Sequence, residues 1–328
     1  MSELTYSKRP LSIPQQVKRL KERGMIIDDE QQALKLLSHV SYYRLRNYTS
    51  PFQDNTEGSE HLYLRDDLHF SDVIDLHRFD ERLKVLLYNT LGKVELAVRT
   101  TISQVYAEAN NDGHWFLDEG LFDEEFFTEK TYRNIDGSVT TYVPFDDMMS
   151  DFQKDVSRSK EEFIEEYRKK YTSPSLPPSW MSMEVISFGV LSKMYQMLET
   201  SEMKEQVAKK FGVNDVRIFT NWLHAFSLLR NCCAHHNRVW NRRMNVSFIL
   251  PYCKTTHLFM PKNDAKSIRQ NKLFAVLSGL KYMIDVIQPE NTFNQDIREL
   301  IKHAPKLVTL QEMGFPDRWQ LLPIWQIK

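Results

Sequence analysis

The amino-acid sequence predicts an all-α protein: a helical bundle with added N- and C-terminal helices and a small β-hairpin insertion. Glycine is scarce, with 10 glycines in 328 residues, whereas it makes up about 7% of average proteins. A chain that is poor in glycine and rich in Leu, Lys, Glu and Met favours helices over strands and turns. Hydrophobic residues make up 41% and charged residues 27% of the chain, which is typical of a globular protein with a substantial core.

Two short helices are predicted near the N-terminus. The first covers residues 12–24, because Ser12 can cap it, Pro14 suits its first turn and Gly24 can end it. The second covers residues 29–40 and leads into an aromatic and basic segment.

That segment, SYYRLRNYTSPF at residues 41–52, interleaves tyrosines with arginines. Tyrosine rings can stack on unpaired bases and arginines can bind phosphates, so Tyr43 and Arg44 are candidate RNA-binding residues. The alternative is structural: the tyrosines would pack this helical region against the rest of the protein. The sequence leaves both interpretations open.

The longest predicted helix runs from Ser71 to about Ala109. Apolar residues recur in it at three- and four-residue steps, and Ser71 precedes an acidic first turn. Such a helix is expected to be the spine of a bundle. Glu95 and Arg99 lie four residues apart on it, one above the other, and form either a support for a polar site or an ordinary surface pair.

The segment after this helix has a different character. An Asp136-Gly137 turn between β-prone residues predicts a small hairpin on an insertion. A charged helix at about 147–170 and a proline-rich break at 173–180 follow it. Further helices are predicted at residues 180–198, up to Lys210, at 214–238, at about 265–287 and at about 293–303.

Features of export and membrane insertion are missing from the sequence. The first residues have no apolar signal-peptide core, and no run of 18 or more apolar residues is present. Three cysteines, two of them adjacent, do not suit a disulfide framework, which favours a reducing compartment. We therefore expect a cytoplasmic protein without a membrane partner.

Charge is distributed unevenly along the chain. The net charge is −1, yet residues 216–263 contain no Asp or Glu and seven Lys or Arg. Such a block predicts a surface that binds a polyanion, with Arg217, Arg238, Arg242 and Arg243 as candidate RNA-binding residues. The alternative is a solvated basic face that is balanced by acidic residues elsewhere, such as those at 123–127.

The most informative stretch is SLLRNCCAHHNRVWNRRM at residues 227–244. On a helix, Asn231 and His235 share a face, and Arg230 lies about 140° round from His235. The long arginine side chain can still reach the same cleft, particularly where a helix end distorts. We therefore predict that Arg230, Asn231 and His235 converge near one phosphate, with His236 and Arg238 as further candidates.

These residue types suit RNA cleavage without a metal or other cofactor. The ribose 2′-OH is an internal nucleophile, so the protein needs only to move protons and stabilise charge on the phosphate. Histidine can move protons near neutral pH, arginine matches phosphate oxygens, and asparagine can orient either group. One histidine per chain is little for two proton transfers, and a symmetric homodimer would supply a second.

Two other interpretations of this stretch remain. Cys232, His235 and His236, with Cys253 and His257 further along, could form a zinc site, although their spacing fits no common zinc finger or ribbon. The cysteines could equally be small apolar filling. The stretch would then be a polar helix end with a purely structural role.

The Arg230-Asn231-x3-His235 pattern resembles the Arg-x4–6-His signature of the HEPN superfamily. More narrowly, the chain resembles the Abi-like (AbiD/AbiF-type) abortive-infection proteins of bacteria. The segments that carry this resemblance are RPLSIPQQVKRLKERGMIIDD, SYYRLRNYTSPF, RFDERLKVLLYNTLGKVELAVRT, LPPSWMSMEVISFGVLSKMY, LRNCCAHHNRVWN and MGFPDRW.

The resemblance implies a HEPN-type helical bundle and a metal-independent endoribonuclease toxin of antiviral defence. Arg230 and His235 would be the catalytic pair with Asn231 beside the arginine, and His236 could replace His235 because the signature tolerates a longer spacing. Glu95 would support the site together with Arg99. The implied segments are 1–60 (N-terminal helices), 61–110 (first part of the bundle), 111–178 (insertion), 179–250 (second part of the bundle) and 251–328 (C-terminal helices).

The expected function is cleavage of phage or host RNA during infection by a homodimer, with no nucleotide cofactor. The alternative is a non-catalytic module that uses the same basic block to hold a regulatory noncoding RNA. A third possibility is a zinc-stabilised structural or interaction protein.

Overall fold

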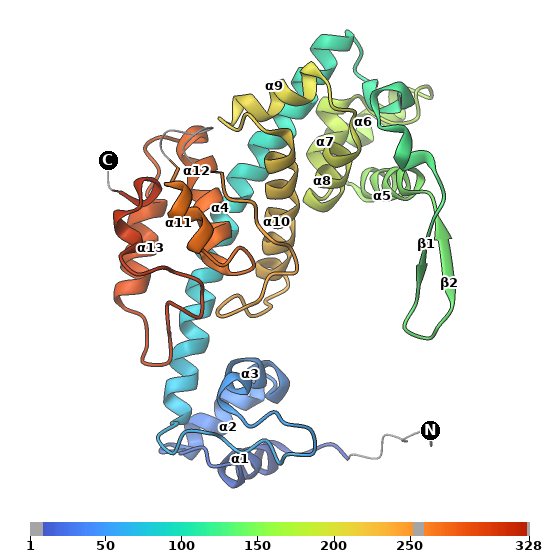
Figure 1. The fold of residues 1–328 in the computed structure, drawn as a ribbon. Coiled ribbons are helices and arrows are strands. Elements are labelled where there is room, and N and C mark those ends of the chain that lie inside the picture. The colour runs from blue at the N-terminus through green and yellow to red at the C-terminus, as the bar shows by residue number, and fades with distance from the viewer. Residues whose placement is uncertain (1–8, 252–258, 327–328) are drawn as a thin grey trace. The chain divides into compact units, whose positions relative to one another are not determined.

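The structure, a computed structural model, describes residues 9–251 and 259–326. Within these residues the chain forms thirteen α-helices, several short 3₁₀ turns and one two-stranded antiparallel sheet (Figure 1). The predicted all-α fold with a small β-hairpin is confirmed. The chain divides into two compact units, Met1–Lys84 with Arg298–Thr309 and Val85–Ile297 with Leu310–Lys328. The five segments inferred from the sequence stay a prediction.

The first unit contains three short helices and the beginning of a long one. Their bounds are Ile13–Glu22 for α1, Glu30–His39 for α2, Tyr42–Thr49 for α3 and Phe70–Asn110 for α4. The predicted cap of α1 is confirmed, because the hydroxyl of Ser12 accepts a hydrogen bond from the backbone N–H of Gln15, and the side chain of Gln15 accepts one from the backbone N–H of Ser12. Most of the aromatic and basic segment forms α3, which directly follows α2.

A buried polar cluster joins α3 to the first half of α4 within this unit. The phenol of Tyr48 donates a hydrogen bond of 2.6 Å to Oδ2 of Asp80, and Nζ of Lys84 lies 3.3 Å from the same oxygen. The ring of His77 packs edge-on against that of Tyr48, and its Nδ1 is 3.4 Å from Oε2 of Glu81. Tyr48 is only 1% exposed, so this tyrosine of the segment has a packing role.

The second unit contains the rest of α4 and most of the remaining helices. These are α5 (Pro144–Arg158), α6 (Glu162–Lys170), α7 (Ser179–Val185), α8 (Phe188–Met197), α9 (Glu202–Lys210), α10 (Val216–Ala234), α11 (Lys262–Ser267), α12 (Leu273–Ile287) and α13 (Phe293–Lys302), the last of which is shared with the first unit. Helix α10 packs against α8, α9 and α12. Its side chains Phe219, Trp222 and Phe226 are fully buried, which makes α10 a central helix of this unit's core.

The predicted hairpin is confirmed. Strands β1 (Lys130–Arg133) and β2 (Val139–Tyr142) pair in antiparallel register. Gly137 adopts a φ of +85° in the turn between them, a conformation that glycine reaches without a steric penalty.

The single helix predicted at about 147–170 is wrong, because the chain forms α5 and α6 with a break between them. The guanidinium group of Arg168 donates hydrogen bonds to the carbonyl groups of Val156 and Ser159. These carbonyls lie at the end of α5, where the carbonyl of Val156 also accepts the backbone N–H of Ser159. The side chain of α6 thus stabilises the end of α5.

The single helix predicted at about 265–287 is also wrong, since α11 and α12 are separate. The backbone N–H groups of Met244 and Phe248 donate to the carbonyl groups of Asn271 and Gln270, at 2.8 and 2.9 Å. The chain before α12 therefore pairs with the loop after α10. Gly279 of α12 leaves room for the ring of Phe248, which a Cβ atom at that position would meet.

Candidate functional site

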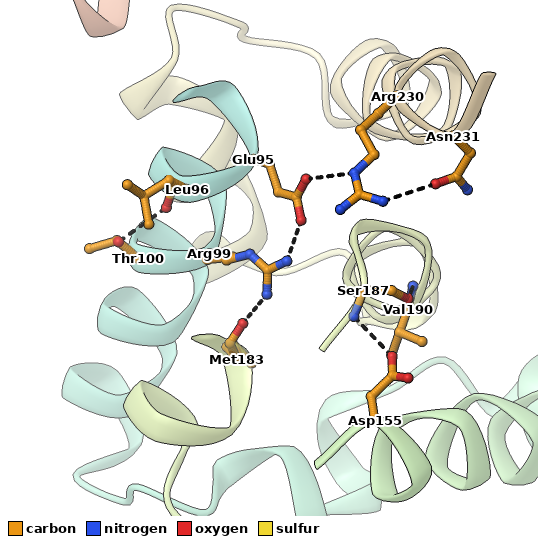
Figure 2. Close-up of polar contacts among 10 residues, drawn as sticks. All are labelled: Glu95, Leu96, Arg99, Thr100, Asp155, Met183, Ser187, Val190, Arg230 and Asn231. Carbon is orange, nitrogen blue, oxygen red and sulfur yellow. Dashed lines mark hydrogen bonds and ion pairs between the residues drawn. The ribbon is translucent and has the colours of Figure 1, made fainter. Parts of the chain in front are cut away.

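Arg230, in the last turns of α10, is held by a carboxylate from α4. Its Nε lies 3.3 Å from Oε2 of Glu95, and its Nη1 donates to Oδ1 of Asn231 at 3.4 Å (Figure 2). The ring centroid of Tyr88 lies 5.7 Å from its Cζ, a cation–π contact. The side chain remains 28% exposed, so a ligand can reach a guanidinium group whose orientation is already set.

Glu95 also binds Arg99, as Figure 2 shows. Oε1 of Glu95 accepts a hydrogen bond from Nη2 of Arg99, whose Nη1 donates to the carbonyl group of Met183 on α7. Glu95 and Arg99 are each 7% exposed, so they are not a surface pair. One buried carboxylate thereby connects α4, α7 and α10.

Helix α10 ends at Ala234, and the helix predicted up to residue 238 is therefore too long. The N–H of Asn237 donates to the carbonyl of Cys232 at 2.9 Å, and that of His236 donates to Cys233 at 3.1 Å. These two bonds form a Schellman motif, in which His236 occupies the left-handed position that glycine usually takes. The φ of His236 is +54°. The chain turns sharply directly after the helix, and both His235 and His236 are exposed.

The predicted RNA-binding arginines of the second unit differ in their contacts and in their exposure. Arg238 lies beyond the helix with its Cζ 5.7 Å from the ring centroid of Trp240, and Nη1 of Arg242 donates to the carbonyl of Arg238 at 3.4 Å. Arg243 is exposed. Arg217 forms a two-pronged pair with Asp215 and lowers the pKa of that carboxyl group. The role of Arg217 in RNA binding stays a prediction.

Tyr43 and Arg44 belong to α3 of the first unit, whereas the residues around Arg230 belong to the second. Tyr43 is 69% exposed, and its ring meets that of Tyr42 edge-on. The phenol oxygen of Tyr42 accepts a hydrogen bond of 2.6 Å from Arg23. Of the tyrosines in this segment, Tyr43 is thus available for an external contact.

The polar network and the helix end lie inside a region that matches a known family. A family model described as Abi-like protein matches residues 35–241, which is more than half of the chain. The chain belongs to the Abi-like protein family. Membership of this family indicates a function in abortive infection. No curated protein and no solved structure matches the chain.

The zinc site considered for this Abi-like protein involves residues both inside and outside the described part of the chain. In residues 9–251 and 259–326, no three His, Cys, Asp or Glu side chains are grouped in a way that could hold a metal ion. Cys253 and His257 lie outside the described residues. None of the helices in the described part of the chain combines the length and the apolar character needed to cross a membrane.

Sequence reasoning missed one residue of the Abi-like site. Tyr88 precedes Glu95 by seven residues, and side chains at this spacing lie on the same face of a helix, two turns apart. That spacing was available as a signal, and the implied support of the site by Glu95 pointed to this face of the helix, but neither singled out Tyr88.

Proposed function

We propose that this Abi-like protein is a HEPN-type endoribonuclease of an abortive-infection system, which cleaves RNA by attack of the ribose 2′-OH without a metal ion. The observation that supports this most directly is the placement of Arg230. Its guanidinium group contacts Glu95, Asn231 and Tyr88 and is still open to solvent, and two exposed histidines follow Arg230 by five and six residues.

In the proposed reaction His235 takes the proton from the 2′-OH of the ribose. The 2′-oxygen then forms a bond to phosphorus while the bond to the 5′-oxygen of the next nucleotide breaks. A protonated histidine supplies a proton to that leaving oxygen, giving a 2′,3′-cyclic phosphate and a 5′-hydroxyl. Arg230 binds the phosphate oxygens and stabilises the additional negative charge in the transition state.

A homodimer would supply another histidine for the second proton transfer. The unit that contains Arg230 has an exposed apolar face on α4 that suits contact with another copy. Val85, Tyr88 and Leu96 of α4 are 71%, 46% and 55% exposed. Gly92, also exposed, lies between them, and this spacing places all four on one side of the helix. Because Tyr88 also contacts Arg230, a second copy that covers this face would lie beside the first copy's site.

The test compares wild type with Arg230→Ala, His235→Ala and His236→Ala on a pool of single-stranded RNA in excess EDTA. Lys169→Ala, which removes an exposed cation of α6, is the control. We expect cyclic-phosphate ends from wild type and the control, and a loss of rate of roughly 10²- to 10⁴-fold on replacing Arg230 or His235.

Unchanged cleavage by His235→Ala together with a loss in His236→Ala would transfer the role to His236. Tight RNA binding without cleavage by any of these proteins would favour the alternative of a module that holds a regulatory RNA.

A further inference from the structure

Two segments of the second unit that lie far apart in the sequence bring basic side chains together. The loop after α10 is joined to the chain before α12 by the backbone hydrogen bonds of Met244 and Phe248 to Asn271 and Gln270. Arg243 directly precedes Met244, and Lys272 directly follows Asn271. Their proximity is therefore a property of the backbone and not of side-chain placement alone.

Lys272 is fixed at the centre of this arrangement. Its Nζ donates a hydrogen bond of 2.8 Å to Oδ1 of Asn241, whose Nδ2 donates to Oε2 of Glu312 at 3.2 Å. Asn241 has a φ of +47°, a left-handed conformation that asparagine tolerates better than most residues. Lys272 also occupies the N-cap position of α12, whose N-terminus adds a partial positive charge.

The surroundings of Lys272 are strongly positive. Burial lowers its pKa, and the nearby charges of Arg269, Arg238 and Arg243 lower it further, while Glu312 acts in the opposite direction. Three arginines thus act electrostatically on Lys272, and the carboxylate of Glu312 already accepts a hydrogen bond from Asn241. Positive charges held together in this way repel one another, and a bound anion would remove that cost.

We propose that Arg238, Arg243, Arg269 and Lys272 form a phosphate-binding cluster for the RNA backbone, separate from the phosphate that is cleaved. This proposal rests on the proposed ribonuclease function and adds a second place at which the protein contacts its RNA substrate. Arg243 and Arg269 are exposed and can offer planar forks to phosphate oxygens, whereas Lys272 supplies a fixed point charge.

RNA fits this cluster better than a small free anion does. Arg238 follows His235 by three residues, which an extended chain spans in at most about 11 Å. An RNA strand with its scissile phosphate beside Arg230 and His235 therefore passes close to the cluster. The segment 230–243, which runs from Arg230 to Arg243, contains no acidic residue that would repel the RNA backbone.

The test measures binding of a fluorescent single-stranded RNA over a series of KCl concentrations, in a His235→Ala background that keeps the RNA intact. The double variant Arg243→Ala/Arg269→Ala removes two exposed charges without disturbing the core. We expect the slope of log affinity against log salt to fall by about 0.7 for each phosphate that the variant no longer neutralises, or about 1.4 for the pair. The charge-matched control is Arg133→Ala/Lys169→Ala, two exposed cations of β1 and α6.

An unchanged slope in the double variant, with cleavage by the protein that retains His235, would overturn the cluster while leaving the ribonuclease intact. Absence of RNA binding by the His235→Ala protein would overturn both proposals. Binding of inorganic phosphate that depends on Arg243 and Arg269, together with an unchanged RNA slope, would identify a small-anion site and also overturn the proposal.

Discussion

Oε2 of Glu95 lies 3.3 Å from Nε of Arg230, while its other carboxylate oxygen binds Arg99. A single negative charge is therefore shared by two arginines, one buried and one open to solvent. The ion pair with Glu95 balances the charge of the buried Arg99, and the contact with Glu95 holds Arg230 in its orientation. These two effects can be separated by experiment.

Replacing Glu95 by alanine should destabilise the protein by about 3–5 kcal/mol, because Arg99 would stay buried without a partner for its charge. The free energy of unfolding in urea measures this effect. Glu108→Ala, at an exposed position of the same helix, should change it by less than about 0.5 kcal/mol. Equal effects of the two substitutions would contradict the bridging role of Glu95.

Glu95→Gln preserves the shape of the side chain but weakens its hold on Arg230. We expect the kcat of RNA cleavage to fall by roughly 10- to 100-fold, because a misplaced guanidinium group stabilises the transition state poorly. If Glu95 only supported the fold, kcat per folded molecule would be unchanged. Circular dichroism of the same samples distinguishes the two cases.

His236→Gly should stabilise the protein by about 1 kcal/mol, since glycine adopts the left-handed conformation without the steric cost that a side chain incurs. Urea unfolding measures the gain, and His236→Ala, which keeps a Cβ atom, should not show it. If His235 is the catalytic histidine, the glycine variant also retains cleavage. A loss of cleavage with normal stability would instead assign catalysis to His236.

Leu96→Glu should convert the proposed homodimer to a monomer and reduce cleavage, because a charge would be buried in the contact between two α4 helices. Sedimentation velocity reports the mass. Leu117→Glu, at another exposed leucine of the second unit, is the matched control. A wild-type protein that cleaves RNA as a monomer at every concentration would refute the dimer.

Stability should decrease as the pH falls below neutral, partly through His77. Burial lowers the pKa of His77 below its ordinary value of 6.5, although Glu81 and Asp80 oppose the shift. Between the folded and unfolded pKa values the unfolded chain binds more protons, so the free energy of unfolding falls as the pH decreases through this window. His77→Asn should flatten this dependence, which urea unfolding at a series of pH values measures. An unchanged pH dependence in His77→Asn would contradict the role of His77.

The local features of this fold could be predicted from the sequence, because neighbouring residues determine them. Ser12 and Pro14 start α1, the Asp136-Gly137 pair forms the hairpin turn, and the spacing of Glu95 and Arg99 places them together on α4. Each of these signals acts within a few residues.

The missed features depend on contacts between distant segments. The break before α12 exists because Asn271 and Gln270 pair with the loop after α10. The contact of Tyr88 with Arg230 likewise forms only once α4 and α10 are packed. The end of α10 was missed for another reason. A histidine, and not the usual glycine, adopts the left-handed conformation there, so the customary stop signal was missing.

The absence of a side chain at Gly279 has a consequence outside the core. The ring of Phe248 occupies the space beside it, and the backbone of Phe248 is one of the two anchors that hold the loop after α10 in place. A methyl group added at this buried position would push the loop outwards and draw Arg243 away from Lys272. If the proposed cluster binds RNA, a buried residue that never contacts RNA thus affects the affinity, and substitutions inside α12 alter it while the exposed arginines stay the same.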